Sequence, residues 1–162
     1  MHWQDKIIAR EAVRPLLERR SAPPGTLVQA SGCFDLLHYG HLLYLEYARS
    51  LGHILVVSIN SDASIRLLKG PTRPFMPEYH RAALLAALSM VDFVVQFDEP
   101  TAERTVEVLR PDFFVKGTDY SPERVLERAA VERHGGVVVI APTPKTYSSN
   151  EVVNRLIAEN AS

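Results

Sequence analysis

The chain has 162 residues, of which 46% are hydrophobic and 23% are charged, a composition ordinary for a soluble globular protein. This length fits one domain with a core that needs neither disulfides nor metals. The formal net charge of -1 provides no positive electrostatic field to bind nucleic acid, so this charge favours a nucleotide-sized ligand over DNA or RNA. The single cysteine, Cys33, fits a reducing cytoplasm, and we expect no secretion signal and no membrane partner.

The first residues predict an element that precedes the main domain. Apolar residues alternate with charges over residues 4–20, which predicts an amphipathic helix despite Pro15. The segment Pro23-Pro24-Gly25 ends this helix. We therefore expect residues 1–25 to form an amino-terminal helix and linker, and residues 26–162 to form the main domain.

From residue 26 onward, short apolar runs alternate with helical patterns. Continuous apolar strands are typical of a parallel sheet that is covered on both faces. The pattern predicts a single α/β domain, a Rossmann-like open parallel sheet with helices on both faces and its site at the carboxyl ends of the strands. The predicted strands are 26–30, 53–59, 93–97, 113–115 and 137–140, and the predicted helices are 42–51, 63–68, 77–89, 101–109, 122–134 and 149–158.

The segment from Ser31 to His41 lies between the first strand and the first helix of this domain. A strand-to-helix turn aims backbone N–H groups and the positive end of the helix dipole at one point, which suits a phosphate. Gly40 leaves room for a ligand near the backbone, and His38 and His41 can each donate to phosphate oxygens. Either histidine alone would be read as a cap or a surface residue. The combination predicts a phosphate site.

A metal site is the competing interpretation of this turn, because Cys33, His38 and His41 are all possible ligands. The chain lacks His-Glu-x-x-His and has one cysteine, so we expect no metal ligands here. It also lacks the Gly-x-Gly-x-x-Gly of dehydrogenases and the Gly-Lys-Ser/Thr of P-loop NTPases.

Residues 32–41 read Gly-x-Phe-Asp-x-Leu-His-x-Gly-His, which resembles the signature of the cytidylyltransferase-like nucleotidyltransferases. With residues 57–62 and 69–74, the chain looks most like the heptose 1-phosphate adenylyltransferases. The resemblance runs from about Thr26 to Leu156 and implies that residues 26–162 are a nucleotidyltransferase domain.

The resemblance also implies roles for individual residues in the first half of the chain. It implies a catalytic role for His38, His41 and Lys69, nucleotide binding by Gly32, Cys33, Phe34 and Gly40, and acceptor binding by Asp35, Asn60, Asp62 and Arg81. Plainer interpretations stay open for some of them. Asp62 could simply cap a helix, Lys69 could be a solvated loop residue, and Arg81 could form a surface or intrahelical pair.

Two later segments complete the implied nucleotide pocket. Residues 115–120 resemble the family's Val-Lys-Gly-Gly-Asp-Tyr, with Thr118 in place of a glycine, although a plain turn would explain them too. Residues 147–149 stand where the family has a Ser-Thr-Thr type helix start, whereas Asn150 and Glu151 depart from it. The nucleotide-binding residues expected from these segments are Lys116, Gly117, Asp119, Tyr147, Ser148 and Ser149.

The implied reaction is attack by a sugar 1-phosphate oxygen on the α-phosphorus of ATP, with release of pyrophosphate. The protein would position two anions and neutralise charge in the transition state, and Mg²⁺ would be carried mainly by the triphosphate. CTP in place of ATP, with glycerol 3-phosphate or a similar alcohol phosphate as acceptor, is one alternative, and FMN adenylylation is another. A non-catalytic nucleotide sensor is the alternative from a different class. The resemblance and the extra amino-terminal helix make a homodimer reasonable.

Overall fold

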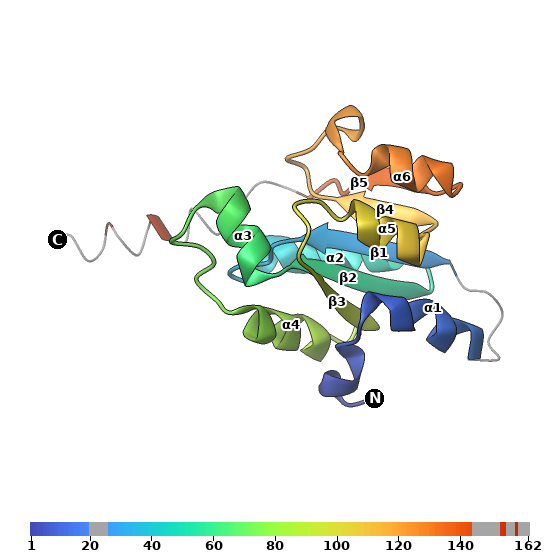
Figure 1. Cartoon of the computed structure of the whole chain (residues 1–162), viewed down its shortest axis with the longest axis horizontal. Helices are drawn as coiled ribbons and strands as arrows, with labels where there is room; N and C mark the ends of the chain where they lie inside the picture. The colour runs from blue at the N-terminus through green and yellow to red at the C-terminus, as the bar shows by residue number, and fades with distance from the viewer. Residues whose placement is uncertain (20–25, 144–152, 155–157, 159–162) are drawn as a thin grey trace.

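The protein is built on a five-stranded, all-parallel sheet with the strand order β3-β2-β1-β4-β5 (Figure 1). The structure is a computed structural model that describes residues 1–19, 26–143, 153–154 and 158. The predicted α/β class with an open parallel sheet is confirmed. The strands are β1 (Leu27–Gly32), β2 (Ile54–Asn60), β3 (Phe93–Phe97), β4 (Phe113–Lys116) and β5 (Val137–Ile140).

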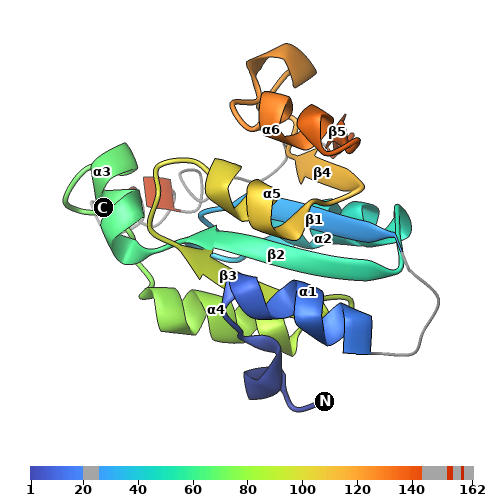
Figure 2. The same cartoon turned by 45° about the vertical axis from the view of Figure 1, so that its right-hand side comes forward.

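Helices cover both faces of the sheet, as predicted (Figure 2). On one face, α2 and α4 pack against alternate residues of β1 and β2, among them Val28 and Val57. On the other face, α1, α5 and α6 pack against the intervening residues, among them Leu27 and Val56. The helices are α1 (Arg10–Arg19), α2 (Tyr39–Ser50), α3 (Asp62–Lys69), α4 (Glu78–Ala87), α5 (Glu103–Leu109) and α6 (Arg128–Arg133).

The strand order creates a switch point between β1 and β4. The chain leaves β1 and builds β2 and β3 on one side, and then returns to place β4 on the other side of β1. In open parallel sheets, ligands bind in the crevice beyond the carboxyl ends of the strands at such a point. The turn that follows β1 therefore occupies the place where the fold favours a binding site.

The predicted helix over residues 4–20 is wrong as a single element. A 3₁₀ turn, η1 (Trp3–Lys6), is followed by an extended Ile7, and only then does α1 begin. The reason is the unpaired edge of β3, because Ile7 forms a bridge with Val94 and the N–H of Ile8 donates to the Val94 carbonyl at 3.0 Å. The amino-terminal segment is thereby packed on the sheet, with Val13 fully buried.

The predicted helix over residues 122–134 is also wrong, because it is interrupted. A 3₁₀ turn, η2 (Pro122–Arg124), precedes α6, and Val125 between them is extended and buried. Burial of Val125 in the core beneath α5 and α6 competes with helix continuation. The predicted helix over 149–158 lies mostly outside the described residues. The other predicted elements agree with the structure to within three residues, and among the described residues no helix has the length and apolar character required to cross a membrane.

Candidate active site

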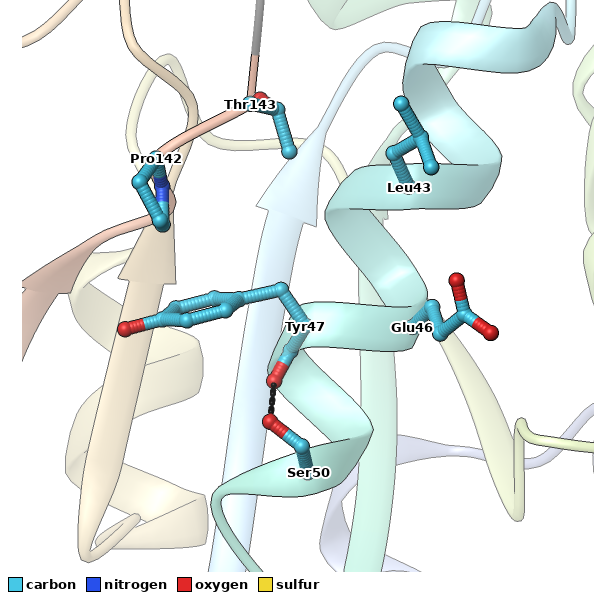
Figure 3. Close-up of a pocket in the computed structure, with 6 residues that line it drawn as sticks. All are labelled: Leu43, Glu46, Tyr47, Ser50, Pro142 and Thr143. Atoms are coloured by element: carbon cyan, nitrogen blue, oxygen red, sulfur yellow. Dashed lines mark hydrogen bonds between the residues drawn. The ribbon is translucent and has the colours of Figure 1, made fainter.

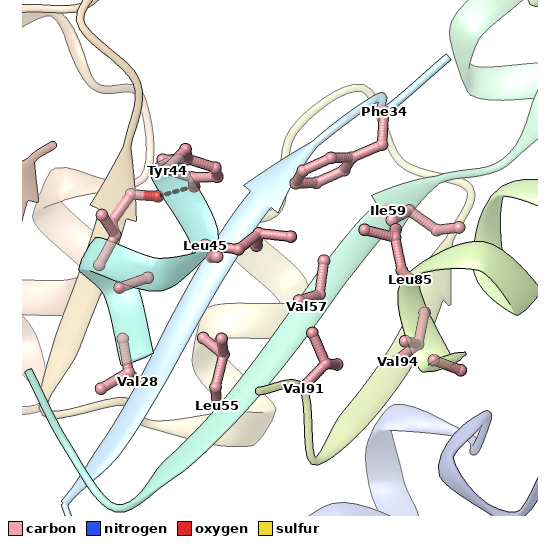
Figure 4. Close-up of a cluster of buried hydrophobic side chains, with 14 of the residues drawn as sticks. Val28, Phe34, Tyr44, Leu45, Leu55, Val57, Ile59, Leu85, Val91 and Val94 are labelled. Carbon is pink, nitrogen blue, oxygen red and sulfur yellow. Dashed lines mark hydrogen bonds between the residues drawn. The ribbon is translucent and has the colours of Figure 1, made fainter. Parts of the chain in front are cut away.

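The turn after β1 is held at the switch point by Tyr44, a fully buried residue of α2 (Figure 4). Its hydroxyl donates to the carbonyl of Val115 in β4 at 2.6 Å and accepts from the N–H of Ser31 in β1 at 3.1 Å. Burial raises the pKa of this hydroxyl, so it stays protonated and keeps donating. One side chain thus joins α2 to the carboxyl ends of both strands that flank the crevice.

Phe34 gives the turn its shape. Its φ of 48° lies in the left-handed region that non-glycine residues rarely adopt. The ring is buried and packs 5.0 Å from the His41 ring, centroid to centroid. A Cβ at position 32 would lie 3.1 Å from the Phe34 ring, so Gly32 provides space for this packing. These contacts give Gly32 and Phe34 a physical reason to be in the motif that does not depend on a ligand.

The two histidines of the motif are stacked, with ring centroids 3.8 Å apart and an interplanar angle of 29°. His38 is the N-cap residue of α2 and His41 lies in its first turn, because the helix begins three residues earlier than predicted. The backbone N–H of His38 donates to Nδ1 of His41 at 3.4 Å. Nδ1 of His38 is buried and has no hydrogen-bond partner among the described residues.

Both rings are neutral at pH 7. Burial is the largest cause that lowers the pKa of His41 to about 4. Charge repulsion from His38 when that ring is protonated, and from Lys69, lowers it further, whereas a hydrogen bond with the backbone of Leu36 raises it. Burial also lowers the pKa of His38. A neutral imidazole retains one N–H group, so each ring can still donate a hydrogen bond to a phosphate that binds at the helix start.

Lys69 lies at the carboxyl end of α3, the helix that follows β2. It is the last residue of α3 rather than a loop residue, and Gly70 ends the helix with a φ of 94°. The side chain is exposed, and its charge acts on His41. The structure therefore places Lys69 within electrostatic range of His41, which is stacked on His38, and the catalytic role of the three residues stays a prediction.

Asp35 is almost fully buried, and protein donors occupy both of its carboxylate oxygens. Oδ2 accepts from Nη1 of Arg73 at 2.8 Å, and Oδ1 accepts from the N–H groups of Phe75 and Met76 at 2.7 and 3.0 Å. The carboxylate thus anchors the segment that follows Lys69. Its expected contact with the acceptor stays a prediction.

Arg81 is buried beneath the site, which excludes the surface-pair interpretation. Its guanidinium donates to the carbonyls of Cys33 (2.7 Å) and Asn60 (2.9 Å), to the carboxylate of Asp62 (2.8 Å), and through Nε to the carbonyl of Met76 (2.9 Å). Arg81 therefore ties together the ends of β1 and β2, the start of α3 and the segment before α4.

The polar residues at the end of β2 lie beside this guanidinium. The amide of Asn60 donates to the hydroxyl of Ser64 at 3.0 Å, and its oxygen lies 3.7 Å from Sγ of the half-buried Cys33. Ser61 is the N-cap residue of α3, so Asp62 is inside the helix and is not its cap.

Lys116, at the end of β4, is buried and faces inward. Its ammonium lies 3.3 Å from Oε1 of Glu127, a buried residue that also accepts from the N–H of Ala102 at 3.0 Å. Gly117 follows it, and a side chain added there would meet open space. Asp119 is exposed in the same turn.

The comparisons with known proteins agree with this geometry. A model of the cytidylyltransferase-like family matches residues 30–155, which is most of the chain. The chain belongs to the cytidylyltransferase-like family. It is accordingly an enzyme of the nucleotidyltransferase type, and the expected family is confirmed.

Relatives named bifunctional protein HldE are substantially similar in sequence. The one from Syntrophotalea carbinolica is 46% identical over 157 residues, covering 97% of this chain and 32% of the relative. The one from Geotalea uraniireducens is 45% identical over 151 residues, covering 93% of this chain and 31% of the relative. The chain thus spans about a third of the length of these curated relatives.

Two solved structures share the fold. A lipopolysaccharide core biosynthesis protein from Thermoplasma volcanium aligns with a TM-score of 0.65 at 29% identity, covering 75% of this chain and all of that one. Pantothenate synthetase from Thermus thermophilus aligns with a TM-score of 0.59 at 20% identity, covering 91% of this chain and 67% of that one. The second likeness shows the fold alone.

Three residues that shape this nucleotidyltransferase site were not predicted from the sequence: Tyr44, Arg73 and Glu127. Arg73 stood within the segment quoted for the resemblance, which was the signal that could have found it. Tyr44 and Glu127 lie in segments predicted as helices. Their hydrogen-bond partners are on other elements far along the chain, so the local sequence gives no sign of these contacts.

Parts of the predicted site lie outside the described residues, namely Tyr147, Ser148 and Ser149. Gly40 lies in the first turn of α2 beside the two histidines. Within the described part of the chain, no group of three or more His, Cys, Asp or Glu residues could hold a metal ion.

A hollow of about 320 Å³ lies on the outer side of α2 (Figure 3). None of the predicted site residues that the structure describes lines it. Its lining comes from α2 and from the segment after β5, namely Leu43, Glu46, Tyr47, Ser50, Pro142 and Thr143.

Proposed function

We propose that this nucleotidyltransferase moves the adenylyl group of ATP to a sugar 1-phosphate, specifically heptose 1-phosphate, and so forms ADP-heptose and pyrophosphate. The observation that carries the proposal is the neutral, stacked pair His38 and His41 at the start of α2, with the charge of Lys69 acting on it. This arrangement offers neutral donors and one cation at the point where the fold places a ligand.

In the proposed reaction, a phosphate oxygen of the acceptor forms a bond to the α-phosphorus of ATP. The bond from that phosphorus to the bridging oxygen breaks, and its electron pair leaves with pyrophosphate. A phosphate monoester is already a nucleophile at neutral pH, so the reaction requires no general base. The protein contributes positioning and neutralisation of charge, through His38, His41 and Lys69. Mg²⁺ enters as part of the substrate, bound to the triphosphate.

The choice of acceptor rests on similarity. The segments 57–62 and 69–74 resemble the heptose 1-phosphate adenylyltransferases, and the Thermoplasma volcanium neighbour is named for lipopolysaccharide core biosynthesis. ATP and CTP present the same phosphates to His38 and His41, so these histidines do not distinguish between the two nucleotides. We favour ATP over CTP because of the same similarity in sequence.

A pyrophosphate-release assay that crosses ATP and CTP with three acceptors tests the proposal. The acceptors are heptose 1-phosphate, glycerol 3-phosphate and flavin mononucleotide. We expect release with ATP and heptose 1-phosphate, and loss of release in the His41→Ala variant. Greater release with CTP would replace adenylyl by cytidylyl transfer. Binding of ATP without release in any combination would favour a sensor.

A further inference from the structure

Lys116, one of the residues expected to bind the nucleotide, forms a buried pair with Glu127 that has no role in the proposed chemistry. Lys116 retains 8% of its exposure and Glu127 retains 4%. The carboxylate of Glu127 is held from a second direction by the N–H of Ala102, the N-cap residue of α5. Three elements, β4, α5 and α6, therefore meet at this carboxylate.

Lys116 could bind a phosphate only by leaving this pair. The departure would leave the carboxylate of Glu127 buried without its cation, which is strongly unfavourable in a protein interior. The ammonium also contacts two aromatic rings, which further restrict its position. It lies over the ring of Phe114 at 5.3 Å and over the ring of Tyr120 at 5.2 Å, measured to the centroids.

Tyr120 is the exposed end of this arrangement. The residue is 47% exposed, although one face of its ring is covered by the Lys116 ammonium. The turn before it is closed by a hydrogen bond from the N–H of Tyr120 to the carbonyl of Gly117 at 3.2 Å. Burial, Glu127 and Cys33 each raise the pKa of the Tyr120 hydroxyl. Tyr120 follows Lys116, the last residue of β4, and β4 is paired with β1, so the residue lies in the turn beyond the carboxyl end of β4, at the switch point.

We propose that Tyr120 is a base-binding residue whose ring packs against the base of the nucleotide, and that Lys116 and Glu127 are positioning residues that hold this ring. The inference rests on the proposed function, since it needs a nucleotide with its phosphates at the start of α2. A π-face held rigidly by a cation is a good surface for a planar base. Lys116 then acts on the base through Tyr120, and it does not neutralise a phosphate.

Two probes separate these roles, because inorganic tripolyphosphate has the phosphates of ATP but no base. Their dissociation constants are measured by calorimetry with excess Mg²⁺. Tyr120→Leu should weaken ATP roughly 5- to 150-fold, the range for loss of one base–aromatic stack. It should leave tripolyphosphate binding unchanged. Tyr120→Phe keeps the ring and should bind ATP like the wild type.

The positioning residues are tested with the same two probes. Glu127→Gln should weaken ATP and spare tripolyphosphate, whereas the matched control Glu123→Gln, an exposed acid of the same segment, should change neither. The double variant Lys116→Met with Glu127→Gln avoids an unpaired buried charge and should behave like Glu127→Gln. Equal weakening of both probes in this double variant would make Lys116 a phosphate ligand and overturn the inference.

The same samples are also assayed for pyrophosphate release, so a failure of the proposed transfer reaction can be distinguished from a failure of the role of Tyr120. Wild-type binding with the expected pattern but no release would reject the transfer reaction and leave the role of Tyr120 standing. Release by the wild type together with unchanged ATP affinity in Tyr120→Leu would reject the role of Tyr120 alone. If the wild type fails to bind ATP, both are rejected.

Discussion

Asp35 and Arg73 form a buried ion pair, 2.8 Å between Oδ2 and Nη1, that joins the turn before α2 to the segment after α3. The side chains retain 2% and 15% of their exposure. Because this segment begins directly after Lys69, the pair couples the position of the lysine to that of the two histidines. The aspartate of the motif therefore has an architectural task in addition to any contact with substrate.

Asp35→Ala should destabilise the protein by about 3–5 kcal/mol, because it removes the buried carboxylate that accepts from Arg73 and from two backbone N–H groups. Urea denaturation measures this loss. The exposed Asp98→Ala is a suitable control and should change the free energy of unfolding by less than about 0.5 kcal/mol. An Asp35→Ala protein of wild-type stability that has lost only affinity for the acceptor would show that the carboxylate serves the substrate alone.

Arg81→Lys should be nearly as damaging as removal of the side chain. A lysine ammonium is a compact donor and cannot reach the four acceptors that the planar guanidinium contacts. We expect a loss of about 3 kcal/mol or more in the free energy of unfolding, measured as a lower denaturation midpoint. An unchanged midpoint with a raised KM for the acceptor would instead make Arg81 a substrate ligand.

The strands were well predicted because each is a short, mostly apolar segment, such as residues 93–97 with the single polar residue Gln96, and such segments favour a covered sheet. The turn from Ser31 to His41 was predicted because glycine and two histidines between a strand and a helix are an uncommon combination. Local pattern was sufficient for both.

What the sequence did not predict depends on partners far along the chain. The sequence alone predicts that Arg81 lies on the surface of a helix, whereas in the structure it donates to carbonyls at the ends of β1 and β2. The sequence alone predicts that Glu127 is a solvated acid on a helix, whereas in the structure its carboxylate lies 3.3 Å from the Lys116 ammonium. The breaks at Ile7 and Val125 have the same cause, since an edge strand and a core pocket overrode helical periodicity.

Lys69→Met tests neutralisation of charge, because methionine keeps much of the length of lysine and removes its ammonium. We expect a large loss of turnover with little change in thermal midpoint, since Lys69 is exposed at the end of α3. Arg66→Met, an exposed cation of the same helix, is the matched control and should retain activity. Collapse of folding in Lys69→Met would identify the lysine as structural.

His41→Ala should lower turnover more than it lowers affinity for nucleotide, because a donor at this position strengthens its hydrogen bond as charge builds up in the transition state. Loss of one such donor costs about 2.7–4 kcal/mol of barrier, or roughly a hundred- to a thousandfold in rate. Steady-state kinetics separate kcat from KM. Near wild-type turnover would remove His41 from the chemistry, and His38→Ala should resemble His41→Ala.

The depressed pKa of His41 also predicts how stability depends on pH. Its pKa falls from 6.5 to about 4 in the folded protein. Between these two values the unfolded chain binds a proton that the folded chain does not, so the free energy of unfolding rises with pH in this window. The contribution of His41 is fully present above pH 6.5 and is lost progressively as the pH falls to about 4.

His41→Gln removes this titration while retaining a polar side chain of similar reach. The free energy of unfolding of the variant minus that of the wild type should therefore increase by about 2 kcal/mol as the pH is lowered from 7.5 to 4, once solvent screening is allowed for. Urea denaturation of both proteins at several pH values gives this difference directly and cancels the titration of shared carboxylates. Parallel curves across the range would mean that His41 titrates in the folded protein as it does in the unfolded chain, and that its burial at the start of α2 does not keep it neutral.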